Sequence, residues 1–281
     1  MKNKFRILKI FITVVLFGFL LSFSLKRFSK APLEKITINM NEKTPVYFVD
    51  EKEVKDLIKK ENPSLTIGKL NIPVLEKTLN KIPAVDSANV YLNLNGNLNL
   101  DIKQRVPIFR IINGDQDYYV DAKGVAFPLS RNYSHPCMLV TGDVKKSEYV
   151  KLASLISKIN ADDFTKKFFI GISKKKNSYS LLTSEGNYNV ELGDLDNIDF
   201  KINGFKAFVT KFLVDADPEK YSQISLKYNN QIVTTLNPHF AGNDSILNAN
   251  YKELQRIPIT NNKKITAAKT VKTAAPKKSK P

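Results

Sequence analysis

Cysteine and histidine are nearly absent from this chain of 281 residues, which has one cysteine and two histidines. Cys137 cannot form an internal disulfide, so buried apolar surface must stabilise the fold. Its apolar neighbours favour a buried small side chain over a reactive thiol. His135 and His239 each lie beside a proline, with no second His, Cys or carboxylate at metal-ligand spacing. We therefore expect both histidines at the surface, and neither a metal nor a cofactor.

Motifs of the common enzyme classes are also missing. The sequence has no phosphate-binding glycine loop, no nucleophile-elbow serine and no zinc-protease helix motif. Its acidic pairs fit loop solvation and helix capping better than acid/base catalysis; they are Asp115 with Asp117, Asp162 with Asp163, and Asp215 with Asp217. We expect no enzymatic activity, with a membrane-anchored cell-wall enzyme built from convergent carboxylates as one alternative.

Acidic residues are lacking at both ends of the chain, which accounts for most of the net charge of +17. Residues 1–30 and 261–281 each carry seven Lys or Arg and no acid. The intervening 31–260 has 30 basic and 27 acidic residues and is close to neutral. Because nucleic-acid-binding domains concentrate basic charge on one face of the fold, we expect no nucleic-acid partner. The basic tail is expected to make at most a weak contact with anionic wall polymer or lipid.

A long uncharged hydrophobic run covers residues 10–25. As a helix it would span about 24 Å at ~1.5 Å per residue, close to the ~30 Å of a bilayer core. We expect a transmembrane helix over 10–28. The alternative is a cleaved secretory signal, because Ser22 and Ser24 offer small residues for a cleavage site. Four basic residues precede the run and three follow it, which favours a cytoplasmic N-terminus over 1–9 and export of the rest.

A small α+β unit is predicted after the membrane helix. Alternating apolar residues predict a strand over 36–40. Asp50 and Glu53 form a capping-box pattern at the start of a first helix. A second helix is predicted from Asn71 to Pro83. Two further strands close the unit, so we expect both helices on one face of a three-stranded sheet.

The last two strands of this unit are joined at Asn95-Gly96-Asn97. A two-residue Asn-Gly turn would put the leucines of the two strands on opposite faces of the sheet. We therefore predict a three-residue loop over 95–97. That loop pairs apolar residues on one face: Leu94 with Leu98, Leu92 with Leu100, and Val90 with Ile102.

From Ile108 the pattern changes to short strands, which predict a mixed β-rich domain. The strands are expected over 108–112, 118–121, 125–127, 138–141, 168–173, 179–183 and 188–192. Two helices interrupt them, one over 150–159 and a longer amphipathic helix over 198–212. A terminal hairpin follows, in which a tight Asn229-Asn230 turn pairs Tyr228 with Gln231, Leu226 with Val233, and Ile224 with Thr235.

Beyond Leu236 the sequence offers at most one short helix, around Tyr251, and the Lys, Ala, Thr and Pro mixture from Asn261 predicts disorder. The fold class is therefore α+β, with a membrane helix, a strand-helix-helix-strand-strand domain, a β-rich domain with two helices and a disordered basic tail. The predicted boundaries are 1–9, 10–28, 29–106, 107–236 and 237–281.

Five stretches of sequence carry a resemblance to a known family. Residues 68–70 and 79–90 look like parts of a POTRA domain. Residues 104–108 (Gln-Arg-Val-Pro-Ile), followed by a Tyr-Tyr-Val-Asp run over 118–121, look like the start of a β domain. Residues 225–233 are similar to a closing hairpin. On these residues the chain resembles the FtsQ/DivIB family of single-pass cell division proteins, from the membrane helix to about Leu236.

The resemblance implies a non-enzymatic scaffold of the divisome, held in the cell inner membrane as a single-pass type II protein, with its bulk in the periplasm at the division septum. It implies that the POTRA domain contacts other division proteins and that the last strand pairs with a strand of FtsB, which comes with FtsL. This is β-strand addition. Matched by position, the partner-binding residues are Lys227, Tyr228, Gln231, Ile232, Val233, Thr234 and Thr235.

Some points stay open at the level of sequence. The family has Asp and Arg where this chain has Ser225 and Lys227. Arg105 fits an ion pair at the domain junction as well as a binding role. A POTRA-containing envelope export or outer-membrane assembly accessory protein is the alternative function, although the remaining length cannot hold a complete transport barrel together with the predicted helices.

Overall fold

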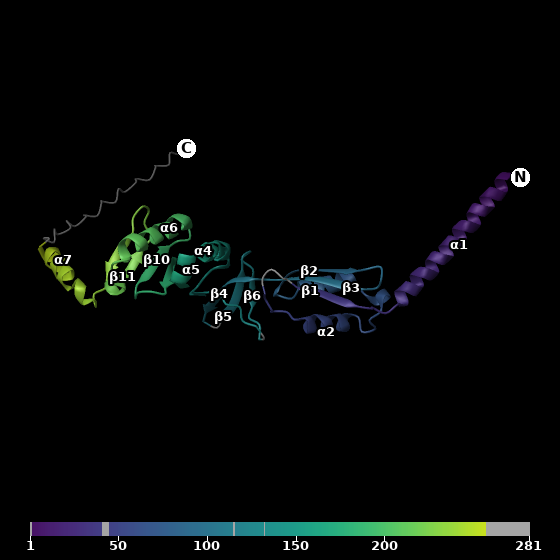
Figure 1. Ribbon diagram of the computed structural model, residues 1–281, viewed down its shortest axis with the longest axis horizontal. Helices are drawn as coiled ribbons and strands as arrows, with labels where there is room; N and C mark the ends of the chain where they lie inside the picture. Colours follow the sequence, from purple (N-terminus) through teal and green to yellow (C-terminus); the bar gives the residue numbers. More distant parts are fainter. Residues whose placement is uncertain (1, 41–44, 115, 132, 257–281) are drawn as a thin grey trace, which may run out of the picture. The chain divides into compact units, whose positions relative to one another are not determined.

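The computed structural model describes residues 2–40, 45–114, 116–131 and 133–256 (Figure 1). The chain divides into two units, residues 1–236 and 237–281. The described part of the second unit contains a single turn of 3-10 helix, Ala241–Asn243, and helix α7 (Asp244–Arg256), where the sequence predicts at most one short helix. The predicted disorder from Asn261 onward lies outside the described residues.

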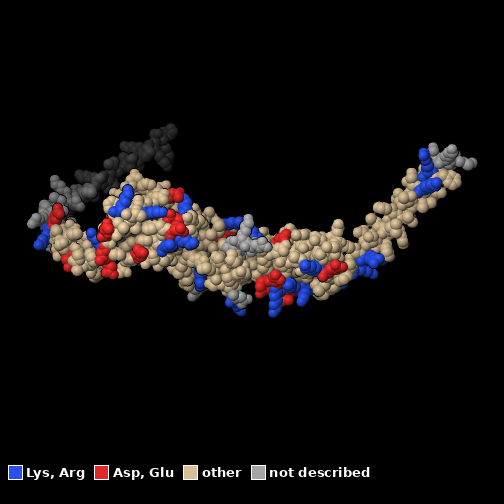
Figure 2. Space-filling model, in the orientation of Figure 1, with Lys and Arg blue, Asp and Glu red and all other residues tan. Residues whose placement is uncertain are grey.

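The first helix, α1 (Lys2–Lys30), includes the predicted membrane segment. Its stretch Phe5–Lys30 is long and apolar enough to cross a membrane, by length and composition, and none of it is buried in the protein. Figure 2 shows basic residues at both ends of this helix and an uncharged surface between them. Basic side chains at these places can reach the polar headgroups. The prediction of one apolar helix near the N-terminus is confirmed.

A small three-stranded sheet follows, formed by β1 (Ile36–Met40), β2 (Val85–Leu92) and β3 (Leu98–Gln104) in the order β1-β3-β2. β1 is parallel to β3, and β2 is antiparallel to it. Helices α2 (Glu51–Glu61) and α3 (Ile72–Asn80) bury their apolar residues against alternating residues of the strands. The predicted order of elements is confirmed.

Both helices begin where they were predicted to begin, and Asp50 is the predicted cap of the first. The Asp50 carboxylate accepts a hydrogen bond from the Glu53 backbone N–H at 2.7 Å, and the Asn71 side chain accepts one from Val74 at 3.2 Å. These bonds satisfy N–H groups that have no partner inside the first turn of a helix.

The predicted register of the β2–β3 hairpin is wrong by two residues. Leu92, not Leu94, lies opposite Leu98, and Val90 lies opposite Leu100. The loop is longer than predicted because Asn93 closes it, donating its N–H to the Asn97 carbonyl at 2.9 Å. Leu94 is left in the loop with 97% of its surface exposed. A two-residue slip keeps every strand side chain on its own face, so the apolar face is as predicted.

The strands predicted beyond Ile108 join into one nine-stranded sheet in the order β12-β11-β10-β9-β8-β7-β4-β5-β6. Its strands are β4 (Pro107–Asn113), β5 (Gln116–Asp121), β6 (Ala126–Pro128), β7 (Met138–Thr141), β8 (Phe169–Lys175), β9 (Ser178–Thr183), β10 (Asn189–Gly193), β11 (Tyr221–Ser225) and β12 (Val233–Leu236).

Two predicted helices are present in this part, and a third was not predicted. They are α4 (Tyr149–Ala161) and α6 (Ile198–Phe208), the latter continuing as a π-helical segment Val209–Leu213. The additional short helix α5 (Asp163–Phe168) begins where the Asp162 side chain accepts the Thr165 N–H at 3.0 Å. The acidic residue interpreted as a capping group therefore caps a helix that the apolar pattern did not reveal.

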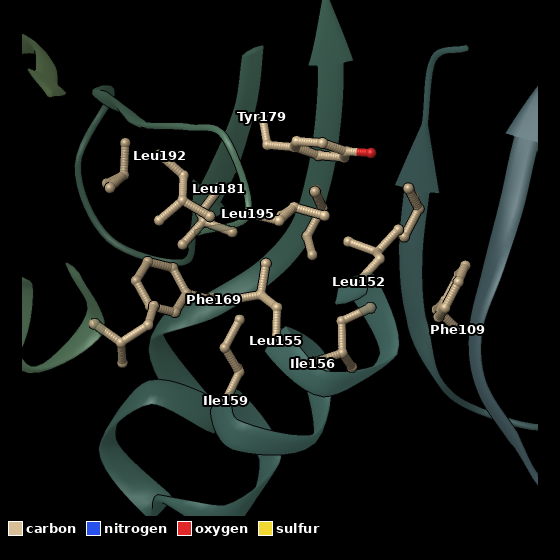
Figure 3. Packing of buried hydrophobic residues seen from close by; sticks show 14 of the residues in the cluster. Phe109, Leu152, Leu155, Ile156, Ile159, Phe169, Tyr179, Leu181, Leu192 and Leu195 are labelled. Atoms are coloured by element: carbon tan, nitrogen blue, oxygen red, sulfur yellow. The ribbon is translucent and has the colours of Figure 1, made fainter. Parts of the chain in front are cut away.

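The main core lies between α4, α6 and one face of the nine-stranded sheet. In Figure 3 the α4 side chains Leu152, Leu155, Ile156 and Ile159 point toward strand residues that include Phe169 and Leu181. All of them are essentially buried. Burial of this size is the main favourable contribution to folding in a chain with no disulfide.

A separate small cluster joins residues before α2 to strands β5 and β6. Phe48 packs edge-to-face against Tyr119, Phe127 and Tyr133, with ring centroids 5.5, 5.4 and 4.8 Å apart. Val46 is buried in the same cluster. Such ring pairs add to the stabilisation from buried area alone.

Next to this cluster the prediction for His135 as a plain surface residue is wrong. His135 is half-buried, its backbone N–H donates to the Tyr119 hydroxyl at 3.1 Å, and its Nδ1 lies 2.9 Å from the Tyr133 hydroxyl. Burial lowers the pKa of the imidazole from its ordinary value. His239 is exposed, as predicted.

Cys137 is half-buried against the same cluster, and burial raises the pKa of its thiol to about 11. The thiolate is the reactive form of cysteine. Its position agrees with the prediction of a packing role rather than a reactive one.

Arg105 forms ion pairs where the two sheets meet. Its guanidinium donates to Asp121 at 2.7 Å and lies 3.5 Å from Asp86. Lys123 also contacts Asp86, at 2.6 Å. The hydrogen bond from Lys123, with further help from neighbouring positive charges, holds the pKa of Asp86 below its ordinary value. Of the two interpretations of Arg105, the junction ion pair is the one that the contacts support.

We predict that Ile156→Ala lowers the free energy of unfolding by about 2–5 kcal/mol, because it removes fully buried methyl groups from the centre of the main core. Val150→Ala, on the exposed side of the same helix, is the control and should change it by less than about 0.5 kcal/mol. Denaturant unfolding of the full-length protein in detergent measures both. Equal effects of the two substitutions would contradict the assignment of this core.

Candidate partner-binding edge

The strand that the resemblance singles out, β12, is the terminal strand of the nine-stranded sheet. On one side it pairs with β11 in antiparallel register. Within the described residues no strand pairs with its other side. An edge of this kind carries backbone N–H and C=O groups that can hydrogen-bond to an added strand.

The predicted tight turn before β12 is wrong. β11 ends at Ser225, and Ile224 lies opposite Thr234 instead of Thr235. Leu226 lies outside the hairpin ladder; its N–H donates to the Glu191 carbonyl of β10 at 2.7 Å, and its side chain is buried in the main core. The connection therefore runs as a loop from residue 226 to residue 232, and within it Asn230 has the positive φ expected of a turn residue.

This shift by one residue changes which side chains of β12 face solvent. Val233, at 41% exposure, and Thr235 are exposed, while Thr234 and Leu236 are half-buried. Ile232 packs against the main core. The predicted register would have turned Val233 toward the core, beside Leu226. The structure instead gives the edge strand one exposed face that a partner can contact.

The seven predicted binding residues divide into three groups. Val233 and Thr235 are exposed on one face of β12, and Thr234 is half-buried on the other. Lys227, Tyr228, Gln231 and Ile232 lie in the loop before the strand, where Ile232 is half-buried and the other three are exposed. The structure thus brings two of the seven together on the exposed face of the edge strand and places four in the adjoining loop.

A small cavity of about 180 Å³ lies between this loop and α6. Tyr228, Asn230 and Ile232 line it from the loop, and Phe200, Lys201 and Gly204 line it from the helix. Sequence reasoning missed the helix residues. A signal was present, since Phe200 is apolar but falls outside the core-facing positions 198, 202 and 205, and it is largely exposed.

Lys201 in this cavity is almost fully buried and is held by Asp194. Its ammonium donates to the Asp194 carboxylate at 2.6 Å and to the Asp194 carbonyl at 3.0 Å. The hydrogen bond from Lys201 is the main reason that the pKa of Asp194 is lowered from its ordinary value. The charge of Lys201 is therefore neutralised within the protein.

Ser225 and Lys227, which differ from the residues expected of the family, both contact other residues near this edge. The Ser225 hydroxyl donates to the Glu191 carboxylate at 2.8 Å, and Gln223 donates to the same carboxylate at 3.0 Å. An aspartate at 225 would instead place a second negative charge beside Glu191. Lys227 lies over Gly193, where an added Cβ would be 3.0 Å from the lysine Cγ.

The other sequence candidates have structural roles. Asp117 is paired with Arg110, Asp162 caps α5, and the Asp217 side chain accepts the Glu219 N–H at 2.8 Å. Among the described residues, no group of three His, Cys, Asp or Glu side chains is arranged to hold a metal ion.

Two family models and one known protein sequence agree with this architecture. Residues 106–235 match the family model described as "FtsQ/DivIB, C-terminal related", and residues 33–103 match the model of a POTRA-like domain. The cell division protein DivIB of Clostridium tetani (strain Massachusetts / E88) is 24% identical over 220 residues, covering 70% of this chain and 83% of that protein. The major extracytoplasmic domain of the trans isomer of DivIB from Geobacillus stearothermophilus was matched with 10% identity and a TM-score of 0.29, covering 41% of this chain and 98% of that chain.

The apolar N-terminal helix, the POTRA-like domain and the β-rich domain together define a membrane-anchored cell division protein. The chain belongs to the FtsQ/DivIB family.

We predict that Asp194→Asn destabilises the protein at neutral pH, because it leaves the buried Lys201 without its counter-charge. The folded carboxyl group has the lower pKa, so the ion pair contributes fully above the pKa of the unfolded group, about 4, and its contribution is lost as the pH falls through the folded value. The difference in unfolding free energy between the parent and the variant should therefore shrink below about pH 4.

Asp196→Asn is the matched control, since Asp196 pairs with Lys151 and both side chains are largely exposed. It should change stability little at any pH. A stability difference for Asp194→Asn that stays constant down to pH 2 would contradict the role of this ion pair.

Proposed function

We propose that this protein is a non-enzymatic scaffold of the divisome that binds an FtsB- and FtsL-like partner by β-strand addition at β12. The observation that carries the proposal is the position of β12 as a terminal strand with an exposed face. The family supports a role in cell division. Strand addition supplies the physical means, because backbone hydrogen bonds give affinity whatever the partner's side chains.

The contacts around β12 suggest how a partner strand is selected. A strand beside β12 places alternate side chains next to Val233 and Thr235, since directly opposed side chains lie about 5 Å apart. Tyr228 and Lys227, in the adjoining loop, flank the start of the edge. Ile232 and Thr234 contribute indirectly, because they hold the strand on the core. Side chains on the exposed face thus supply specificity and the backbone supplies affinity.

We further propose that residues 1–9 lie in the cytoplasm and that the chain crosses the inner membrane once. The POTRA domain (29–106) and the β domain (107–236) would then lie in the periplasm at the septum. The excess of basic residues before the apolar run supports this orientation. The basic tail would be free to contact anionic wall polymer or lipid.

We predict that Val233→Glu weakens binding of the FtsB-like partner by about tenfold or more, which is about 1.4 kcal/mol. The new charge lies on the exposed face where the added strand must pack. Co-purification and titration with the partner measure the effect. Leu94→Glu, at the most exposed leucine of the POTRA hairpin, is the matched control and should bind normally. Unchanged recovery of the partner with Val233→Glu would remove the proposal.

A pair of proline substitutions distinguishes the contribution of backbone hydrogen bonds to partner binding from that of the side chains. Consecutive N–H groups of a strand point to opposite edges, so one of Thr234→Pro and Thr235→Pro removes an N–H from the open edge and the other removes one from the β11 side. We predict that one variant loses partner binding with little loss of stability, while the other is destabilised. Normal binding by two folded proline variants would exclude strand addition.

Protease treatment of spheroplasts tests the orientation. We predict that external protease digests residues beyond α1 and leaves a short fragment containing the N-terminus, since only the segment before and within the membrane is shielded. A tag before Lys2 reports the fragment by immunoblot. Protection of the full-length chain would contradict export of the two domains.

A further inference from the structure

The POTRA-like domain begins without a linker after the membrane helix. Helix α1 ends at Lys30, and the carbonyl of the next residue, Ala31, accepts the Ile67 N–H at 3.0 Å. The Leu33 N–H then donates to the Leu65 carbonyl at 2.8 Å. The first residues after α1 are therefore already hydrogen-bonded into the folded domain.

Gly68 allows a close approach at the same place. A Cβ added to Gly68 would lie 2.6 Å from the Ser29 carbonyl oxygen and 2.7 Å from the Ser29 Cβ. Any larger residue would therefore have to displace the last turn of α1. Gly68 belongs to the 3-10 turn Ile67–Lys69, so this turn lies directly beside the end of the membrane helix.

The loop between β2 and β3 lies at this end of the domain as well. The Gly96 carbonyl accepts the Glu34 N–H at 3.4 Å, and a Cβ added to Gly96 would lie 3.3 Å from the Ile67 side chain. The Gly96 N–H donates to the Asn93 carbonyl at 3.0 Å, so the loop has a defined shape. The end of the domain nearest to α1, hereafter the proximal end, consists of residues 31–34, 65–69 and 93–97.

Leu94 is the apolar side chain that this loop leaves uncovered, with 97% of its surface exposed. A single exposed leucine is ordinary on a protein surface, so its meaning depends on where it lies. Leu94 is two residues from Gly96, and at ~3.5 Å per residue its backbone lies within about 7 Å of the Gly96 backbone. Gly96 in turn packs on Ile67, beside the residues that follow α1. Leu94 therefore lies close to the place where the chain leaves the membrane.

The depth of the proximal end follows from the length of α1. The uncharged run ends at Leu25, and the helix from there to Lys30 adds about 7.5 Å at ~1.5 Å per residue. The polar headgroup layer on each side of a bilayer is about 5–7 Å thick. Lys30 thus lies near the outer boundary of the headgroups. The proximal end, which is hydrogen-bonded from Ala31 onward, lies directly upon them.

The charges around the proximal end favour an anionic surface. Lys69 and Glu34 are its charged residues, and the last two turns of α1 add Lys26, Arg27 and Lys30. All five side chains are exposed. Four positive charges against one negative charge give a surplus of three. Basic side chains near an anionic leaflet are attracted to its surface potential.

We propose that the proximal end is a membrane-contact surface, in which Leu94 inserts among the lipid headgroups and Lys69 binds their anionic phosphates. The partner is an anionic lipid bilayer, because α1 holds the domain beside one without an intervening linker. Binding at a bilayer interface combines buried apolar area with electrostatic attraction, and the proximal end supplies both. The inference holds whichever side of the membrane carries the domain, and it does not depend on the partner of β12.

Fluorescence quenching in reconstituted vesicles tests this contact. The full-length protein, in a Cys137→Ser background, carries a polarity-sensitive fluorophore at Leu94→Cys. The vesicles consist of phosphatidylethanolamine and phosphatidylglycerol, with a small share of a lipid that has a nitroxide near its headgroup. We expect the nitroxide lipid to quench the fluorophore strongly, because the label at position 94 lies among the headgroups.

Lys52→Cys is the matched control position for the same fluorophore. Lys52 is exposed in the first turn of α2. That turn follows Val49, whose N–H is bound by Gln104 at the last residue of β3, whereas the Leu94 loop precedes the first residue of β3. The two labels therefore lie toward opposite ends of the domain, and we expect no quenching at position 52.

Charge reversal at Lys69 tests the electrostatic part. Adding Lys69→Glu to the protein labelled at position 94 should lower the ratio of lipid-contacting to water-exposed label about fivefold or more, corresponding to about 1 kcal/mol. Lys81→Glu is the matched control, since Lys81 is exposed and close to Pro83, which Arg105 binds at the domain junction. It should leave the ratio unchanged. Far-UV circular dichroism checks that each variant remains folded.

Three results would overturn the proposal. Equal quenching at positions 94 and 52 would show that the proximal end does not rest on the lipid. A blue-shifted label at position 94 that the nitroxide lipid fails to quench would show that protein, such as a second copy of this chain, covers Leu94. Equal effects of Lys69→Glu and Lys81→Glu would show that Lys69 binds no lipid phosphate.

Discussion

Backbone hydrogen bonding in an open sheet must end somewhere, and this constraint organises the larger domain. The nine strands are joined in one sheet, and its two terminal strands are treated differently. β12 keeps an exposed face with Val233 and Thr235. β6 is short and ends in a proline, which has no N–H to offer. The same physical property, an unpaired strand edge, is therefore presented at one end of the sheet and restricted at the other.

The exposed edge strand, β12, is held in place by packing against the main core and not by a tight turn at Asn229-Asn230. Ile224 and Leu226 are buried, and Ile232 packs against the same core after the loop. Burial of these side chains outweighs the preference of Asn229-Asn230 for a tight turn, because a buried aliphatic side chain contributes about 1.5–3 kcal/mol. The result is an edge strand whose inward face is anchored, which limits the ordering cost of adding a further strand.

Local signals in the sequence were sufficient for most elements, though not for α5, and they were not sufficient for the strand register. The caps at Asp50 and Asn71 are encoded within four residues; the Asp50 cap and the start of the second helix near Asn71 were predicted. A period of two assigns faces but leaves a two-residue slip undetected, as at Leu92 and Leu98. In the last hairpin a one-residue shift turns Val233 outward, and the burial of Leu226 in the main core is a contact with distant residues that the local pattern does not show.

Part of the candidate site was likewise predicted from the sequence, and part was not. The resemblance pointed to residues 227–235, and the structure puts two of the predicted residues, Val233 and Thr235, on the exposed face of β12. Phe200 and Lys201 were missed because they reach the site from a helix about thirty residues earlier in the chain. The strand order and the packing of Phe48 on Phe127 are likewise contacts between distant residues, which no local pattern encodes.

The Tyr133 hydroxyl carries a single proton and lies near two acceptors, the Pro45 carbonyl at 3.2 Å and His135 Nδ1 at 2.9 Å. The neutral imidazole can accept that proton at Nδ1 or donate its own from there, according to its tautomer. The imidazolium, with hydrogen on both nitrogens, can only donate. Protonation of His135 therefore commits the tyrosine proton to the Pro45 carbonyl.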